Sequence, residues 1–274
     1  MANSQASADY TVRLVFSSFE GYSARPSLNN NVAVVTVSPG NREIIRLTRD
    51  QVANNFSYSY GYRYFAGKAL AKMPDTSFQY LLPVSTGSTI RVTTVSSELQ
   101  KIVQKIPTEL RATGFAFKLG DTICAARAGT VYLTSDTVKE GEKRSEILKR
   151  GRNRINIEHR NGTIGYYEIS APIQLLVEPG DEVIPGQPLA VLNKESEKYT
   201  VFFSVYYLDE KKLTSNNSIE NNSLIVQTYL PVYFYNGEPG HPIMLEFWKE
   251  YTAQRTPAII SAEMTKKEKK KFGY

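Results

Sequence analysis

Short apolar runs alternate with turn-forming residues along most of this chain. Val, Ile, Thr and Tyr dominate the runs at 10–16 and 31–37, and these residues favour strands. From residue 115 onward such runs return at short spacing, at 122–126, 130–134, 154–158, 163–169, 173–177, 188–192 and 199–207. Many short strands separated by turn signals predict a mainly β protein of the sandwich or barrel type.

One segment has a helical pattern instead. Between residues 98 and 110, apolar residues recur on one side of a helix, at Leu99, Ile102, Val103 and Ile106. Pro107 disfavours continuation of this helix. We therefore predict an N-terminal β-sandwich-like domain over 1–76 and a second β domain over 77–235, with one short helix between the two strand-rich regions. Residues 236–274 are predicted to form a C-terminal extension that ends in a basic tail.

A row of aromatic residues occupies alternate positions from Phe56 to Tyr64, with Tyr58, Tyr60 and Tyr62 between them. Alternation places the rings on one face of an extended chain. We favour a cross-strand aromatic ladder over a small core. A strip that stacks against a ligand is the open alternative.

Composition narrows the class of protein. Hydrophobic residues make up 41% and charged residues 22% of the chain, which excludes a disordered protein. The last twelve residues hold five Lys and two Glu, so they carry +3 of the net charge of +6. Because the excess charge lies in a tail, nucleic-acid binding is disfavoured. No apolar run approaches the ~18 residues of a membrane span, so we expect no transmembrane segment.

Three motifs carry a resemblance to a known family. They are GFAFKLGDTICAARAGTV at 114–131, NIEHRNGT at 156–163 and VEPGDEVIPGQPL at 177–189, and Tyr167 lies between the last two. In this order they resemble the lysostaphin/LytM-type zinc endopeptidases, which cut peptidoglycan cross-bridges. The resemblance implies a barrel-sandwich hybrid fold for the second domain.

The resemblance fails at the metal ligands. Such an enzyme holds zinc with two His and one Asp and leaves a position open for water. Gly114 stands where the family has its Asp, and no His precedes His159. Ile169 replaces the His of the Tyr-x-His-Leu motif, while Thr200 and Phe202 replace the His-x-His pair. We expect no metal, no other cofactor and no catalytic residue.

These four replacements are the candidate groove positions, and Tyr167 and Glu168 are further candidates beside them. His159 is interpreted as a structural, hydrogen-bonded residue, and His241 as exposed in a turn. The lone Cys124 lies in an apolar run and is expected to be a buried, inert thiol.

The leading hypothesis is a catalytically inactive, peptidase-like protein of the bacterial cell envelope, in the periplasm or at the surface. It would bind peptidoglycan or a partner protein of the envelope, such as a cell-wall hydrolase that it regulates. The given N-terminus lacks the features of a signal peptide, so an envelope location implies that this chain is a mature segment. Two alternatives stay open: an active zinc metallopeptidase with atypical ligands, and a structural or surface-assembly subunit.

Overall fold

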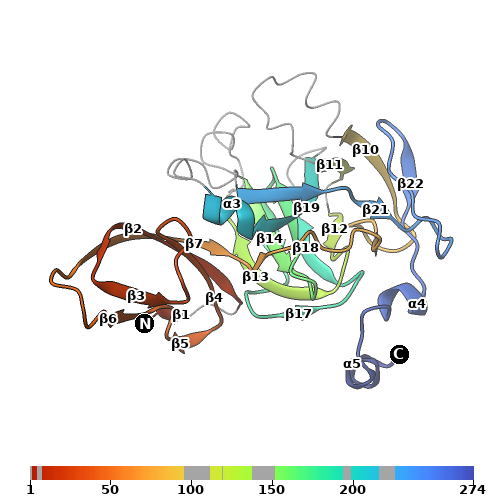
Figure 1. Cartoon of the computed structure of the whole chain (residues 1–274). Coiled ribbons are helices and arrows are strands. Elements are labelled where there is room, and N and C mark those ends of the chain that lie inside the picture. The colour runs from red at the N-terminus through yellow and green to blue at the C-terminus, as the bar shows by residue number, and fades with distance from the viewer. Residues whose placement is uncertain are drawn as a thin grey trace. The chain divides into compact units, whose positions relative to one another are not determined.

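The computed structural model describes residues 2–4, 8–95, 112–118, 120–137, 152–193, 199–215 and 226–274. Its elements are predominantly strands, so the predicted mainly β class is confirmed (Figure 1). The helix predicted over 98–110 lies outside the described residues. Among the helices that are described, none is both long and apolar enough to span a membrane.

The chain divides into two compact units. Unit 1 comprises Met1–Pro74 and Tyr207–Thr228, and unit 2 comprises Asp75–Tyr206 and Tyr229–Tyr274. The division predicted from the sequence, with boundaries after residues 76 and 235, stays a prediction.

Unit 1 is built on a three-stranded antiparallel sheet in the order β4-β2-β7. Its buried core consists of Leu14, Phe16 and Ala33. The rings of Phe16 and Tyr60 lie 5.7 Å apart across the sheet. The strands are β1 (Ala2–Ser4), β2 (Tyr10–Glu20), β3 (Tyr22–Arg25), β4 (Val32–Val37), β5 (Gly40–Arg42), β6 (Arg46–Arg49), β7 (Ser57–Ala66) and β8 (Ala69–Leu70).

A short helix, α3 (Glu210–Ser215), also belongs to unit 1. The Asn- and Ser-rich composition of residues 211–223 predicts a polar loop, and this is wrong for residues 211–215. The Asp209 side chain accepts a hydrogen bond from the Lys211 amide at 2.9 Å, and Leu213 is fully buried. The Asp209 cap and the burial of Leu213 therefore stabilise this short helix.

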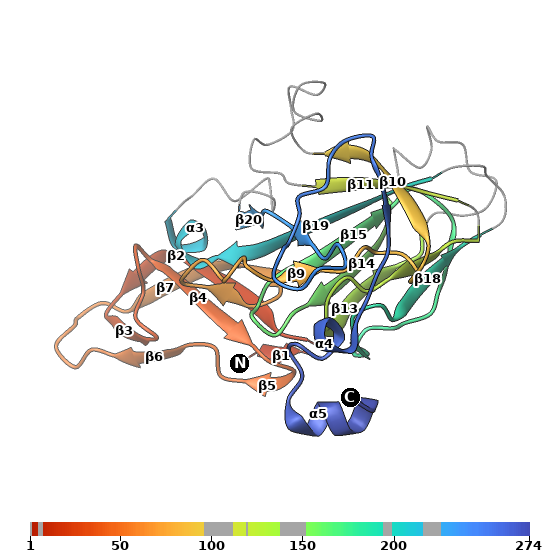
Figure 2. The ribbon, with the colours of Figure 1, turned by 90° about the vertical axis from the view of Figure 1, so that its right-hand side faces the viewer.

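Unit 2 contains a large antiparallel sheet with the strand order β17-β13-β14-β15-β19-β11-β10-β22. Figure 2 shows its strands β13, β14, β15, β19, β11 and β10. A second sheet has the order β12-β18-β16. Strands of the large sheet are β10 (Thr89–Val95), β11 (Ala112–Phe117), β13 (Gly129–Ser135), β14 (Asn153–Glu158), β15 (Ile164–Ile169), β17 (Glu182–Val183), β19 (Tyr199–Asp209), β20 (Gln227–Leu230) and β22 (Glu250–Thr252). The others are β9 (Gln79–Tyr80), β12 (Thr122–Cys124), β16 (Ile173–Leu175), β18 (Pro188–Leu192) and β21 (Tyr233–Phe234).

The large sheet has one core face and one outward face. Along β15 and β19, Tyr167, Ile169, Val201 and Phe203 are buried, and the rings of Tyr167 and Phe203 are 4.8 Å apart. The residues between them are only half-buried. Since side chains of a strand alternate between its two faces, the half-buried set points away from the core.

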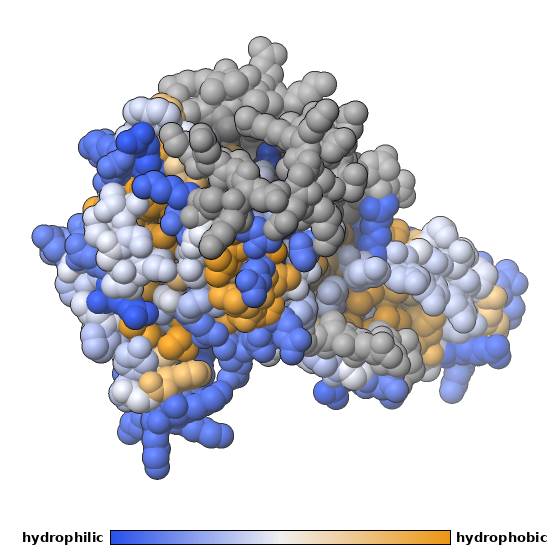
Figure 3. Space-filling view, turned by 180° about the vertical axis from the view of Figure 1, so that it is seen from behind, coloured by the Kyte–Doolittle hydropathy of each residue, from blue (hydrophilic) through white to orange (hydrophobic). Residues whose placement is uncertain are grey.

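The C-terminal extension folds as part of unit 2. Its helices are α4 (Pro257–Ile260) and α5 (Lys266–Phe272). Thr265 and Glu268 form a capping box at the start of α5, and Gly273 ends it with a left-handed conformation. The lysine-rich α5 gives the hydrophilic surface at the lower end of the space-filling view (Figure 3). The basic tail is therefore a capped helix rather than an extended terminus.

Candidate functional site

Strand register brings three of the four candidate groove positions together. Gly114 of β11 lies opposite Phe202 of β19, and on the other side of β19 Phe202 lies opposite Glu168 of β15. Thr200 and Tyr166 share the same face by alternation. We call the surface formed by Gly114, Tyr166, Glu168, Thr200 and Phe202, together with Arg152, which contacts Glu168 and Phe202, the Phe202 face.

The missing side chain of Gly114 lets its neighbours close over β11. A Cβ at this position would lie 3.0 Å from Thr94 Cβ, 3.1 Å from Phe202 Cε1 and 3.2 Å from Thr200 Cγ2. These distances are tighter than ordinary carbon contacts of 3.5–4.0 Å. Any side chain at this position would therefore require Thr94, Phe202 or Thr200 to shift by a few tenths of an ångström.

The carboxylate of Glu168 is engaged at both oxygens. Its Oε1 forms an ion pair with Arg152, and its Oε2 accepts a hydrogen bond from the Tyr166 hydroxyl at 3.1 Å. The Arg152 guanidinium also lies 5.1 Å from the centre of the Phe202 ring. Arg152 therefore joins the charged and the aromatic parts of the Phe202 face through an ion pair and a cation–π contact.

Ile169 and Tyr167 do not belong to this surface. Ile169 pairs with Val201 in register, and its side chain is completely buried on the core face. The Tyr167 hydroxyl accepts a hydrogen bond from the Ala126 amide at 2.7 Å, also in the core. Of the candidate positions named from the sequence, the structure brings together Gly114, Glu168, Thr200 and Phe202.

Arg152 and Tyr166 are members of this cluster that the sequence analysis misses. Arg152 ends a charged insertion and belongs to none of the resembling motifs. Tyr166 directly precedes a motif residue, but a tyrosine in a strand is commonplace. Their role follows only from the pairing of β14, β15 and β19.

The tyrosines around Glu168 stay protonated at neutral pH. Burial, followed by the negative charge of Glu168, raises the pKa of Tyr166 and raises that of Tyr229 to about 12. They therefore offer neutral hydroxyl groups and aromatic surface rather than phenolate bases.

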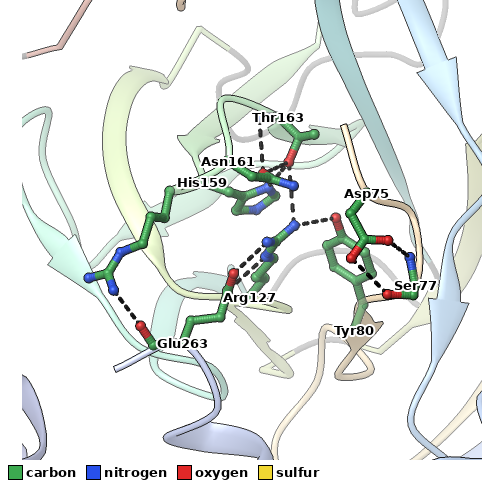
Figure 4. Close-up of polar contacts among 9 residues, drawn as sticks. Asp75, Ser77, Tyr80, Arg127, His159, Asn161, Thr163 and Glu263 are labelled. Carbon is green, nitrogen blue, oxygen red and sulfur yellow. Dashed lines mark hydrogen bonds and ion pairs between the residues drawn. The ribbon is translucent and has the colours of Figure 1, made fainter. Parts of the chain in front are cut away.

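A second polar cluster surrounds the buried guanidinium of Arg127 (Figure 4). Arg127 donates to Glu263 from Nε at 2.8 Å, and from Nη1 to the Tyr80 hydroxyl at 3.0 Å. Its guanidinium carbon lies 4.0 Å from the centre of the Phe78 ring. Next to it, Arg160 donates to the Glu263 carbonyl and pairs with Glu268 at the start of α5. This cluster attaches the segment that contains α4 and α5 to the strands of unit 2.

The two histidines of the chain have different surroundings. His159 is buried, its Nδ1 lies 2.8 Å from Thr163 Oγ1, and burial and then the charge of Arg127 lower its pKa. It is therefore a neutral structural residue, as the sequence predicts. His241 is exposed in a turn. Cys124 is buried, and burial raises the pKa of its thiol, as expected for an inert cysteine.

Metal-binding side chains do not gather in the described part of the chain. Within those residues no three His, Cys, Asp or Glu side chains form a group that could hold a metal ion. Among the residues that define the Phe202 face, Glu168 is the single carboxylate, and none is a histidine. The donor set at the described positions does not fit the two His and one Asp that the resemblance implies.

Comparisons with known proteins give a weak likeness. No family model matches the chain, and no curated protein matches it. Among solved structures, it is similar to one titled "putative peptidase M23" from Pseudomonas aeruginosa, with 13% identity and a TM-score of 0.31. That match covers 71% of this chain and 82% of the other. The chain's own residues must therefore carry any conclusion about function.

Proposed function

We propose that this protein is a catalytically inactive, peptidase-like protein of the bacterial cell envelope that binds peptidoglycan peptides on the Phe202 face. The observation that carries the proposal is the packing of Phe202 against Gly114 and Thr200, beside the Arg152–Glu168 pair. By the sequence resemblance, Gly114 stands at the position of a metal-binding Asp, and the Phe202 ring lies close to it. The surface is suited to binding rather than to activating water.

The Phe202 face is suited to a peptide that carries both positive and negative groups. Arg152 and Glu168 pair with each other, but each is about a quarter exposed, so a ligand can reach both charged groups from solvent. Phe202 and Tyr166 add half-buried aromatic surface next to them. Peptidoglycan stem peptides carry carboxylates and amino groups along a short chain. Such a ligand can pair with both signs while its apolar side chains cover the rings.

Sedimentation with insoluble cell-wall sacculi tests binding directly. The wild-type protein should pellet with sacculi, and Phe202→Ala should lose most of this binding because it removes the ring and its contact with Arg152. Phe272→Ala is the matched control, since Phe272 is also a half-buried phenylalanine of unit 2. It lies on α5, which pairs through Lys271 with Glu182 of β17, four strands from β19 in the sheet order. Equal binding by Phe202→Ala and the wild type would contradict the proposed site.

Two further measurements separate the alternatives. Stoichiometric zinc in the purified protein together with cleavage of peptidoglycan would establish an active metallopeptidase with atypical ligands. Failure to bind sacculi, combined with Phe202-dependent binding to a purified cell-wall hydrolase, would identify a protein partner as the ligand of this face.

A further inference from the structure

Strand β7 of unit 1 is an edge strand with an aromatic surface. It pairs with β2, and in the described residues no strand pairs with its other side. Every residue from Ser57 to Tyr64 is exposed. An unpaired edge offers a row of backbone N–H and C=O groups to another strand.

The tyrosines of β7 extend the core face of the sheet beyond its edge. Tyr60 lies opposite Phe16 and Tyr62 opposite Leu14, and both of these β2 residues are buried in the core of unit 1. On β7 the same face is open, because Tyr58, Tyr60, Tyr62 and Tyr64 are 51–68% exposed. The aromatic layer is therefore incomplete at this edge, and another strand would continue both the sheet and the layer.

The usual protections of an edge strand are scarce here. The sequence SYSYGYRYFA of β7 contains no proline and one charged residue, Arg63. Natural edge strands are commonly short or carry lysine, proline or inward-pointing charges. A ten-residue strand with four exposed tyrosines has the character of an interface.

We propose that β7 pairs antiparallel with β7 of a second copy of this chain, with the two-fold axis at Gly61. The pattern of β7 is self-complementary in this register. Tyr58 lies opposite Tyr64 of the partner, Tyr60 opposite its Tyr62, and Ser59 opposite its Arg63. All tyrosines then pair with tyrosines on one face, where aromatic cross-strand pairs stabilise a sheet.

The position of Gly61 on the axis fits this arrangement. A Cβ built on Gly61 meets no atom within 4 Å, so its surroundings on the single chain are open. The two Arg63 side chains do not face each other, because each lies four residues along the strand from the other's cross-strand position. Their Cα atoms are separated by about 14 Å, beyond the screening length of about 8 Å at physiological salt. This isologous contact closes as a dimer and leaves no further β7 edge open. It is independent of the Phe202 face.

Cysteine crosslinking tests both the dimer and its register. Cys124 is the single cysteine and is buried, so Gly61→Cys introduces one reactive thiol per chain. Across the axis the two Cα atoms would be about 4.5–5.5 Å apart, within the range for a disulfide. Arg63→Cys is the control on the same strand, because its Cα atoms would be too far apart. Val52→Cys, at a position 85% exposed, reports random collisions.

The wild type should have twice the mass of 30.8 kDa in light scattering at high concentration. Gly61→Cys should form a disulfide dimer at least tenfold faster than Val52→Cys, and Gly61→Lys should be monomeric with an unchanged circular dichroism spectrum. A monomeric wild type would overturn the proposal, as would dimers that persist in Gly61→Lys. Crosslinking of Arg63→Cys as fast as that of Gly61→Cys would overturn the register.

Discussion

Removal of the Glu263 carboxylate should destabilise unit 2 strongly. The Arg127 side chain is 3% exposed and that of Glu263 is 21% exposed, and their closest N–O distance is 2.5 Å. Breaking a buried ion pair by removing one partner costs about 3–5 kcal/mol, because the other charge stays buried. Tyr80 and Phe78 still contact the guanidinium, and Glu263 is partly in water. We therefore expect Glu263→Ala to lose about 3 kcal/mol, the lower end of that range.

Thermal and urea unfolding, followed by near-ultraviolet circular dichroism, measure this loss. For a unit of this size, 3 kcal/mol corresponds to a decrease in Tm of roughly 6–12 °C. In a double-mutant cycle, Arg127→Met combined with Glu263→Ala should recover most of the loss, because no unpaired charge remains. Glu246→Ala is the control, since its pair with Lys249 is 64% and 58% exposed and should contribute less than about 0.5 kcal/mol. A loss in Glu263→Ala no larger than in this control would refute the reasoning.

Three further predictions concern the Phe202 face and His159. Gly114→Ala places a Cβ 3.0–3.2 Å from Thr94, Phe202 and Thr200 and should lower the free energy of unfolding in urea by about 1–3 kcal/mol. An unchanged urea midpoint would show that the Phe202 ring shifts without cost. Glu168→Gln should lower the pKa of Tyr229 from about 12 in ultraviolet titration, since the carboxylate adds to the effect of burial; a constant pKa would assign the shift to burial alone. The depressed pKa of His159 means that the unfolded chain binds the proton first, so its contribution to stability is complete above pH 6.5 and decreases as the pH falls below 6.5. His159→Gln should flatten that part of the stability profile, and an unaltered slope would contradict the assignment.

Local patterning was sufficient to locate many strands. The apolar run at 188–192 coincides with β18, and the run at 199–207 begins where β19 begins. The run at 154–158 differs from β14 by one residue. Alternation and turn residues act within a few neighbours, so they are visible in sequence alone. By contrast, α3 depends on a buried Leu213 and a local acceptor, and its polar sequence conceals it.

The candidate site was only partly visible in the sequence. The motifs directed attention to Gly114, Thr200 and Phe202, which the structure brings onto one face with Glu168. They also named Ile169, whose side chain lies in the core. A sequence motif gives the order of residues, but the face on which a side chain lies depends on the strand register.

The sequence by itself determined the mainly β class, the absence of histidine before His159 and the place of the charge in the tail. These properties are local or compositional. Only the tertiary structure decided that Arg152 pairs with Glu168, and that Arg127 pairs with Glu263 across 136 positions of the chain. The physical reason is that a charge is stabilised by whichever partner the packed strands and helices bring within hydrogen-bond distance, and sequence separation does not specify that distance.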